Sequence, residues 1–288
     1  MNPSEREPVR KTYKLFVGGA FPRSESGRSY PVVGADGGRL AWAAHASRKD
    51  ARDAVRSARD AFAGWASATA YHRGQILYRV AEMIEGRAAQ FEAELRATGA
   101  PDAAAEVAAA IDRFVHYAGW TDKIAVVAGS ANPVAGPYFN FTVPEPTGVV
   151  AICAPERPAL LGLVSLLAPA LAAGNTTIVV APGSAALVAV DLAECVATSD
   201  VPAGVVNVLT GHHGELAPVL AAHGDVDALD LTGIDDAALA GECERAAADD
   251  IKRLVRPYGR NPDWTTAQHA QAVTATMELK TVWHPKGR

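Results

Sequence analysis

The sequence is short of cysteine, of excess charge and of long apolar runs, and each shortage excludes a class of protein. Its three cysteines, Cys153, Cys195 and Cys243, are too few and too scattered for a disulfide framework or a zinc site. A formal net charge of −5 offers no basic surface for nucleic acid or for an anionic membrane. Residues 1–14 are polar and lack the apolar core of a signal peptide. We therefore expect a cytoplasmic protein that binds neither nucleic acid nor membrane.

The longest apolar run covers residues 159–173 and is interrupted by Gly162, Ser165 and Pro169. It is shorter than the roughly 20 residues that cross a bilayer, so a buried helix is predicted. Hydrophobic residues make up 49% of the chain and charged residues 20%, which is ordinary for a globular protein.

The first half of the chain reads as a hairpin followed by helices. Ser47 and Asp50 form a Ser-x-x-Asp helix start, and the apolar residues behind it, as far as Trp65, recur at spacings of three and four. The predicted elements are strands 14–17 and 30–33, joined across a polar turn at 24–27, and helices 47–65, 71–97 and 102–120.

From Gly148 onward, short apolar runs alternate with helical segments. Such alternation predicts a parallel sheet with right-handed crossovers, which is a doubly wound, Rossmann-like α/β fold. The predicted strands are 148–153, 176–180, 204–209, 226–231 and 251–255, with helices at 159–173, 185–198, 214–222 and 235–248.

Two pieces stand outside this alternation. Residues 137–143 read as a separate strand, and residues 277–283 form a β-prone tail after a helix-like stretch at 265–276. A lone terminal strand has to pair with something, because its unpaired backbone groups form an adhesive edge.

Several segments resemble the aldehyde dehydrogenase superfamily, in the family's own order. Together they cover residues 14 to about 260, and the nearest likeness is the second half of the family 16 enzymes, a repeat already short of catalytic machinery. That half is matched by Asp200 to Val206, Ile251 to Arg253, Tyr258-Gly-Arg260 and the Lys-Thr-Val-Trp tail. The resembling segments are 51–65, 118–124, 145–150 (Glu-Pro-Thr-Gly-Val-Val), 167–175, 201–211 and 223–227.

The resemblance implies a domain plan. Residues 1–264 would form the Rossmann-type domain, with a bridging hairpin at about 130–147, and residues 265–288 a helix-like piece and an oligomerisation strand. The catalytic domain, with its nucleophilic cysteine, would be absent between Arg260 and the tail. The implied interface residues are Tyr138, Phe139, Phe141, Val143, Leu279, Thr281, Val282 and Trp283.

The same resemblance implies that the side chains needed for catalysis are absent from the catalytic positions. Aldehyde oxidation needs a thiolate, an amide that stabilises the oxyanion, and a carboxylate base. Arg157 stands in place of the oxyanion asparagine and Pro257 in place of the base glutamate. The three cysteines are interpreted as buried hydrophobic residues.

The resemblance also implies a damaged cofactor site. Thr232 and Gly233 are the weak remaining candidates for nucleotide contacts, and Asp235 and Asp236 add negative charge where a diphosphate would lie. No cofactor is therefore expected, with NAD left as a possibility. The family positions that are lost fall on Val180, Gly183, Ile234 and Ala238.

Some features receive a plainer interpretation. His212, His213 and His223 are interpreted as surface residues with no metal site, and Glu156 with Arg157 as a solvated or salt-bridged loop, a new polar site being the alternative.

Two functions follow from this. The first is a non-catalytic subunit that joins a full-length aldehyde dehydrogenase in a hetero-oligomer, since the family's bridging sheet extends toward a neighbour's catalytic domain. The alternative is an NAD(P)-binding oxidoreductase with residual or altered activity. A decayed gene product is the third reading, and the retained tail at 277–283 argues against it.

Overall fold

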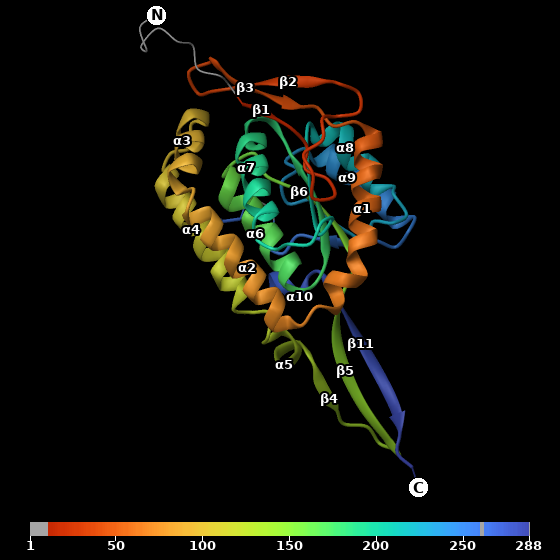
Figure 1. Ribbon diagram of the computed structural model, residues 1–288. Coiled ribbons are helices and arrows are strands. Elements are labelled where there is room, and N and C mark those ends of the chain that lie inside the picture. Colours follow the sequence, from red (N-terminus) through yellow and green to blue (C-terminus); the bar gives the residue numbers. More distant parts are fainter. Residues whose placement is uncertain (1–10, 260–261, 288) are drawn as a thin grey trace, which may run out of the picture.

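The computed structural model describes residues 11–259 and 262–287 and contains three sheets. A five-stranded sheet lies between two layers of helices, a small sheet closes one end, and a three-stranded arm projects from the other end (Figure 1). The expectations that concern residues 1–10 and Arg260 lie outside the described residues.

The central sheet is parallel and has the order β10-β9-β6-β7-β8. The chain starts in the middle at β6, moves outward through β7 and β8, and returns on the other side with β9 and β10. This confirms the predicted doubly wound fold and all five predicted strands, although the ends of the strands differ by one or two residues. The strands are β6 (Val149–Cys153), β7 (Thr176–Ala181), β8 (Val206–Thr210), β9 (Ala228–Asp230) and β10 (Arg253–Val255).

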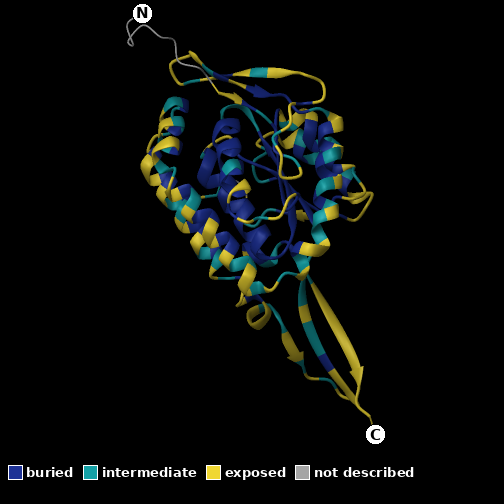
Figure 2. Ribbon diagram, in the orientation of Figure 1, coloured by how far each residue is buried: buried dark blue, intermediate teal, exposed yellow. Residues whose placement is uncertain are grey.

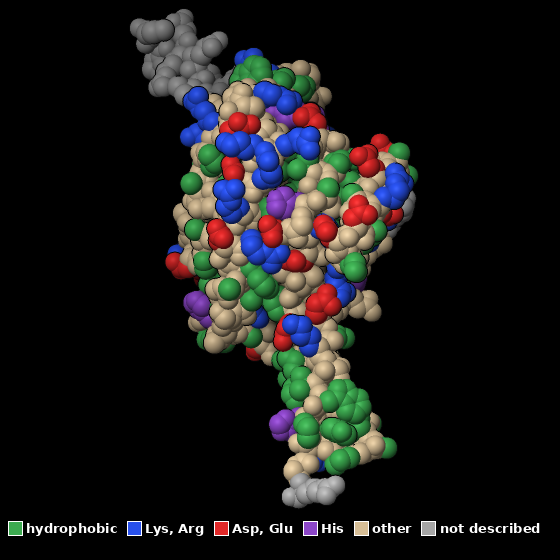
Figure 3. Space-filling model, turned by 90° about the vertical axis from the view of Figure 1, so that its right-hand side faces the viewer, with side chains coloured by type: hydrophobic (Ala, Val, Ile, Leu, Met, Phe, Trp, Pro, Cys, Tyr) green, Lys and Arg blue, Asp and Glu red, His purple; other side chains and the backbone are tan. Residues whose placement is uncertain are grey.

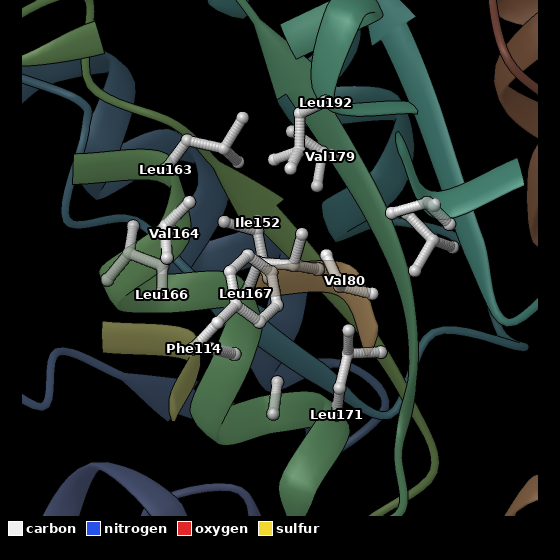
Figure 4. Packing of buried hydrophobic residues seen from close by; sticks show 14 of the residues in the cluster. Val80, Phe114, Ile152, Leu163, Val164, Leu166, Leu167, Leu171, Val179 and Leu192 are labelled. Atoms are coloured by element: carbon white, nitrogen blue, oxygen red, sulfur yellow. The ribbon is translucent and has the colours of Figure 1, made fainter. Parts of the chain in front are cut away.

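The two faces of this sheet have separate cores. Because successive strand residues point to opposite faces, Val150 and Ile152 enter one core while Val149 and Ala151 enter the other. Figure 4 shows the packing of the larger core, and Figure 2 shows that burial is concentrated in the body. The larger core joins α2 (Ala70–Glu85), α3 (Ala88–Thr98), α4 (Ala103–Ala118), α6 (Ala159–Ala172) and α7 (Ala186–Ala197), and the other joins α1 (Arg48–Ser67), α8 (His213–Ala221) and α9 (Ala237–Ala248).

The first helix begins at the motif that predicted it, but the next predicted helix is divided into two helices in the structure. Ser47 caps α1, and its hydroxyl accepts from the amide of Asp50, whose carboxylate accepts from the amide of Ser47. The single helix predicted over 71–97 is wrong, because α2 ends at Glu85 and α3 begins at Ala88. Gly86 caps α2, and glycine is a poor helix former, so a change of direction costs little there.

The predicted pairing of 14–17 with 30–33 is also wrong. The strand β2 (Ser29–Val33) pairs antiparallel with β3 (Arg39–Ala44), and β1 (Thr12–Tyr13) lies parallel on the other side of β3. Phe16 instead bridges to Val208 at the edge of the central sheet. The strand β3 escaped prediction because its buried positions include Ala41 and Ala43, which have little β preference.

The separate strand and the tail pair with each other. The strand β5 (Tyr138–Pro146) lies between β4 (Ser130–Asn132) and β11 (Met277–Pro285) in an antiparallel sheet. The register runs from Met277 opposite Pro146 to Pro285 opposite Tyr138, so the tail is paired along its whole length. This sheet forms the arm, which begins just after the short helix α5 (Ile124–Ala128).

The helix predicted over 265–276 is largely wrong, because only α10 (Gln271–Thr274) forms. The cause is Arg113 on α4, which is 1% exposed. Its guanidinium donates to the carbonyl oxygens of Trp264, at 2.9 Å, and of Ala267. A helix would use these carbonyls for its own hydrogen bonds, so the arginine holds residues 264–267 in an open conformation.

A buried polar cluster attaches β1 to the helices behind it. Asp191 on α7 is fully buried and accepts from Lys11 and from Gln90. The hydroxyl of Tyr13 donates to Glu94 on α3 at 2.5 Å. Burial, and then the neighbouring Asp191, raise the pKa of Glu94 to about 8. Glu94 therefore stays protonated in the folded chain at neutral pH.

This cluster predicts that the folded chain loses stability as the pH rises. Between the unfolded pKa of about 4.5 and the folded pKa of about 8, the unfolded chain ionises Glu94 while the folded chain does not. Glu94→Gln should remove that part of the slope and be about 2 kcal/mol more stable than the parent at pH 8.5, after allowance for partial exposure. Urea unfolding at several pH values tests this, with the exposed Glu85→Gln as control. Parallel pH curves for the parent and Glu94→Gln would contradict it.

Candidate functional site

Two turns meet at the carboxyl edge of the central sheet, between β6 and β9. This is where the strand order reverses, and in open α/β sheets ligands bind at that point. The amide of Gly233 donates to the carbonyl of Cys153 at 3.1 Å. A Cβ on Gly233 would lie 2.4 Å from backbone atoms of Cys153, Ala154 and Pro155. Gly233 therefore allows the two turns to touch, which is a structural role whether or not a nucleotide binds.

Arg157 lies in the turn after β6, where the resemblance places an oxyanion amide. Its guanidinium donates to the carbonyls of Thr98, at 2.7 Å, and of Gly99, at 2.8 Å. Both terminal nitrogens of the Arg157 guanidinium therefore donate to carbonyls at the end of α3. Beside it, Glu156 accepts from the amide and hydroxyl of Ser184 at 3.1 and 3.2 Å. The two side chains are exposed and have different partners.

Pro257, where the resemblance places the base glutamate, lies in the turn after β10. Its neighbours are occupied with packing, since Arg256 pairs with Glu244 at 2.9 Å and the hydroxyl of Tyr258 lies 2.7 Å from that of Tyr117. Proline itself carries no group that could accept a proton, so residue 257 has no part in acid–base chemistry.

The three cysteines are buried and carry high thiol pKa values. Burial raises the pKa of Cys153 well above its usual range, that of Cys195 to about 12 and that of Cys243 to about 11. The thiolate is the nucleophilic form, so these environments disfavour attack on a carbonyl.

We accordingly expect the native chain to resist thiol reagents. With a thiol pKa of about 11, roughly one thiol in a thousand is ionised at pH 8, against roughly a quarter for a free cysteine. Native protein treated with Ellman's reagent at pH 8 should release little colour within minutes, and urea-unfolded protein three equivalents. Rapid stoichiometric labelling of one native cysteine would identify a reactive thiol and contradict the interpretation.

The resemblance implies that residues 180 and 183 would contact the adenosine of a bound nucleotide, but in this chain both residues contact other parts of the chain. Val180 is fully buried, and its carbonyl lies 3.3 Å from Nε2 of His213. A Cβ on Gly183 would lie 2.2 Å from a carboxylate oxygen of Glu156, and the hydroxyl of Tyr30 donates to the Gly183 carbonyl at 3.3 Å. An acidic side chain thus lies close to this turn.

The start of α9, where the resemblance places the diphosphate of a nucleotide, does not fit that group either. The carboxylate of Asp236 accepts from the amides of Ala238, at 2.8 Å, and Leu239, so it occupies the start of α9 where a diphosphate would bind. The amide of Thr232 is used by Asp230 at 2.9 Å, and Ile234 packs against the core. These residues do not fit an NAD molecule.

The histidines noted in the sequence do not converge. The ring of His212 packs against those of His45 and Tyr30 at 5.2 and 5.7 Å, whereas Nδ1 of His223 accepts from the amide of Asp225. Within residues 11–259 and 262–287, no group of three or more histidine, cysteine, aspartate or glutamate residues could hold a metal ion. In the same ranges, no helix is long and apolar enough to cross a membrane.

One pocket of the structure was not predicted from the sequence. A pocket of about 590 Å³ opens between the start of α4, the start of α6 and residues 262–265. Glu106 and Trp264 both line it, although they are far apart in the chain. No motif could have joined them, because their meeting depends on the path of the segment that Arg113 holds.

Comparison with known proteins gives one consistent family. The profile of the aldehyde dehydrogenase family matches residues 23–275. Cytosolic aldehyde dehydrogenase 1 of Elephantulus edwardii is 31% identical over 259 residues, which are 86% of this chain and 51% of that protein. The chain thus spans about half the length of this curated relative.

Solved structures agree with the sequence comparison. HpcC from Thermus thermophilus superimposes with a TM-score of 0.79 at 31% identity, covering 85% of this chain and 47% of that one. An NAD+ complex of the aldehyde dehydrogenase from Bacillus cereus gives 0.75 at 27% identity, over 85% of this chain and 50% of that one.

Proposed function

Because the chain belongs to the aldehyde dehydrogenase family yet has Arg157 and Pro257 at the implied oxyanion and base positions, we propose that it is a non-catalytic subunit. In this proposal it assembles with a full-length aldehyde dehydrogenase and stabilises or regulates that enzyme. Only residues 256–276 separate β10 from β11, which leaves no room there for a catalytic domain.

The arm is the observation that carries the proposal. The outer edge of β11 has no partner strand among the described residues, and a nine-residue open edge invites strand addition. Hydrophobic side chains gather toward the free end of the arm (Figure 3). The exposed large hydrophobic residues of the arm are Tyr138, Phe139, Val143, Leu279, Val282 and Trp283, while Phe141 and Thr281 are the remaining predicted interface residues.

The charges on the arm argue against indiscriminate pairing. Lys280 pairs with Glu145, and Glu278 pairs with Arg253 at 2.7 Å. Charged side chains on an edge strand discourage association with unrelated strands. A partner therefore needs complementary charges as well as a free strand.

The experiment is native mass spectrometry of this chain alone and co-expressed with full-length aldehyde dehydrogenases of the same organism. The proposal predicts a mixed oligomer of defined stoichiometry and a changed specific activity or melting temperature of the enzyme within it. A well-folded monomer or homo-oligomer that never exchanges with any of these enzymes would overturn it.

The likeness to an NAD+-bound structure favours one alternative, an NAD(P)-binding oxidoreductase. Calorimetric titration of NAD+ and NADP+ into the chain separates the two. The occupied amides at α9 support the prediction of no micromolar binding, whereas micromolar affinity would favour the alternative.

A further inference from the structure

We propose that two copies of this chain pair along the open edges of their β11 strands and form a closed twofold dimer. This goes beyond the subunit role, because no enzyme takes part in it. The strand β11 forms one edge of the arm (Figure 1), and its outer side has no partner strand among the described residues. Every residue from Leu279 to Pro285 is exposed. An open edge of this length can pair with a further strand.

The sequence of β11 selects one register for such a pair. Two strands related by a twofold axis across their edges run antiparallel, and the residue on the axis faces itself. The axis has to pass through a residue, because opposite residues of an antiparallel pair point to the same face. With Thr281 on the axis, all nine residues of β11 are paired, and Met277 lies opposite Pro285 of the second copy. Moving the axis by one residue leaves two residues of each strand unpaired.

The cross-strand pairs in this register are complementary. Leu279 lies opposite Trp283 of the second copy, so two side chains that are 60% and 59% exposed in the single chain cover each other. Glu278 lies opposite His284, whose ring N–H can donate to the carboxylate. Two threonines face each other at the axis, and such a pair is favourable between strands. The twofold axis repeats the first two pairs, so each contributes twice.

Neighbouring registers are less favourable because they oppose basic side chains. With Lys280 on the axis, two ammonium groups would face each other, and with Val282 on the axis, Lys280 would face His284. Like charges that lie directly opposite destabilise a pair of strands. In the register centred on Thr281, Lys280 faces Val282 instead, and its charge stays paired with Glu145 of its own arm.

The same register brings the tip of each arm to the base of the other. A pocket of about 570 Å³ lies at the base and is lined by Ile251, Arg253 and Glu278. Because the second copy's His284 lies opposite Glu278, its arm tip reaches this pocket. Ile251 is 92% exposed in the single chain, and burying it would favour the dimer.

This dimer uses the strand edge that the proposed assembly with a full-length enzyme also uses. The two assemblies therefore exclude each other, and the dimer keeps the open edge from unrelated strands until an enzyme competes for it. Dimerisation is measured on this chain alone, so its failure would leave the mixed oligomer standing.

Sedimentation velocity of the full chain, without any enzyme, tests the dimer. Over a dilution series from about 100 µM to about 1 µM we expect a dimer that dissociates reversibly, with no larger species, because a twofold pair is closed. A chain that stays monomeric throughout, or one that forms an open series of larger oligomers, would overturn the proposal.

The variant Thr281→Cys tests the register. Its two thiols would face each other across the axis, with the Cα atoms about 4.5–5.5 Å apart, which a disulfide can span. Oxidised glutathione is the oxidant, and each disulfide formed between two copies releases two molecules of reduced glutathione. We expect a covalent dimer under conditions in which the parent chain stays uncrosslinked, because the three native cysteines are buried.

The matched controls are Lys280→Cys and Val282→Cys, one residue to either side. Their thiols would lie on diagonal positions about 8 Å apart, beyond the reach of a disulfide, and should crosslink at least tenfold more slowly. Equal crosslinking of the three variants would contradict the register. A Thr281→Cys chain that sediments as a dimer but does not crosslink would place the contact elsewhere and overturn the proposal.

Discussion

Replacing Arg113 by methionine is expected to destabilise the chain by about 3–5 kcal/mol, because several buried acceptors lose their donor together. The guanidinium donates to the hydroxyl of Ser165 at 2.5 Å and to the carbonyls of Trp264 and Ala267. Methionine has a similar length and no donor. The lost free energy of unfolding should be measured by urea denaturation.

Limited proteolysis locates the damage. Residues 262–270 should become the first cleavage site in Arg113→Met, since methionine cannot replace this arginine as the donor to the carbonyls of Trp264 and Ala267. Arg56→Met is the control, because the Arg56 side chain is 76% exposed and its ion pair is long, at 3.9 Å. It should cost less than about 0.5 kcal/mol. A loss below about 1 kcal/mol in Arg113→Met would mean that the segment is held by other contacts.

The double substitution Leu279→Asp with Trp283→Asp is expected to weaken assembly with the proposed partner at least about a hundredfold, which is about 2.7 kcal/mol. The two residues lie on one face of β11 and are 60% and 59% exposed in the single chain. Burial of the Leu279 and Trp283 side chains in an interface would make the free energy of association more favourable. Two carboxylates at these positions would make it less favourable, because burying a charge is costly. Affinity measured by mass photometry or ultracentrifugation of the mixed sample tests this.

The same substitutions should change the stability of the isolated chain by less than about 1 kcal/mol, because exposed side chains contribute little. Trp283 packs edge-on against Tyr138 at 5.8 Å, and this contact is the main one that they remove. The matched control is Tyr71→Asp, an exposed aromatic residue that belongs to α2 and not to the arm. If the control disrupts assembly and the double variant does not, the interface is the α2 face and not the arm.

The regular part of the fold could be predicted because its signals are local. Each central strand is an apolar run bounded by polar or glycine residues, and Ser47 with Asp50 starts α1 by contacts three residues apart. The errors occurred where a distant group decides the local structure. Residues 265–276 have helical propensity, but Arg113 takes their carbonyls from another helix. The hairpin error has another cause, because 29–33 pairs with 39–44 across a short local turn and the alanines of β3 have little β preference.

In the candidate site, too, some features follow from the residue types alone and others depend on contacts between distant segments. The amino acids at the positions implied by the resemblance, Arg157, Pro257 and Val180, are read directly from the sequence, and proline and valine have no group to titrate in any conformation. What Glu106 faces, which carbonyls Arg157 contacts and how α9 is capped depend on segments brought together from across the chain. The sequence by itself thus determined the family likeness, the doubly wound sheet and the residue types at the implied catalytic positions, because these depend on residue type and near neighbours. Only the tertiary structure decided the path of residues 262–270, the pairing of β11 with β5 and the pocket between α4 and α6, because each depends on contacts between residues far apart in sequence.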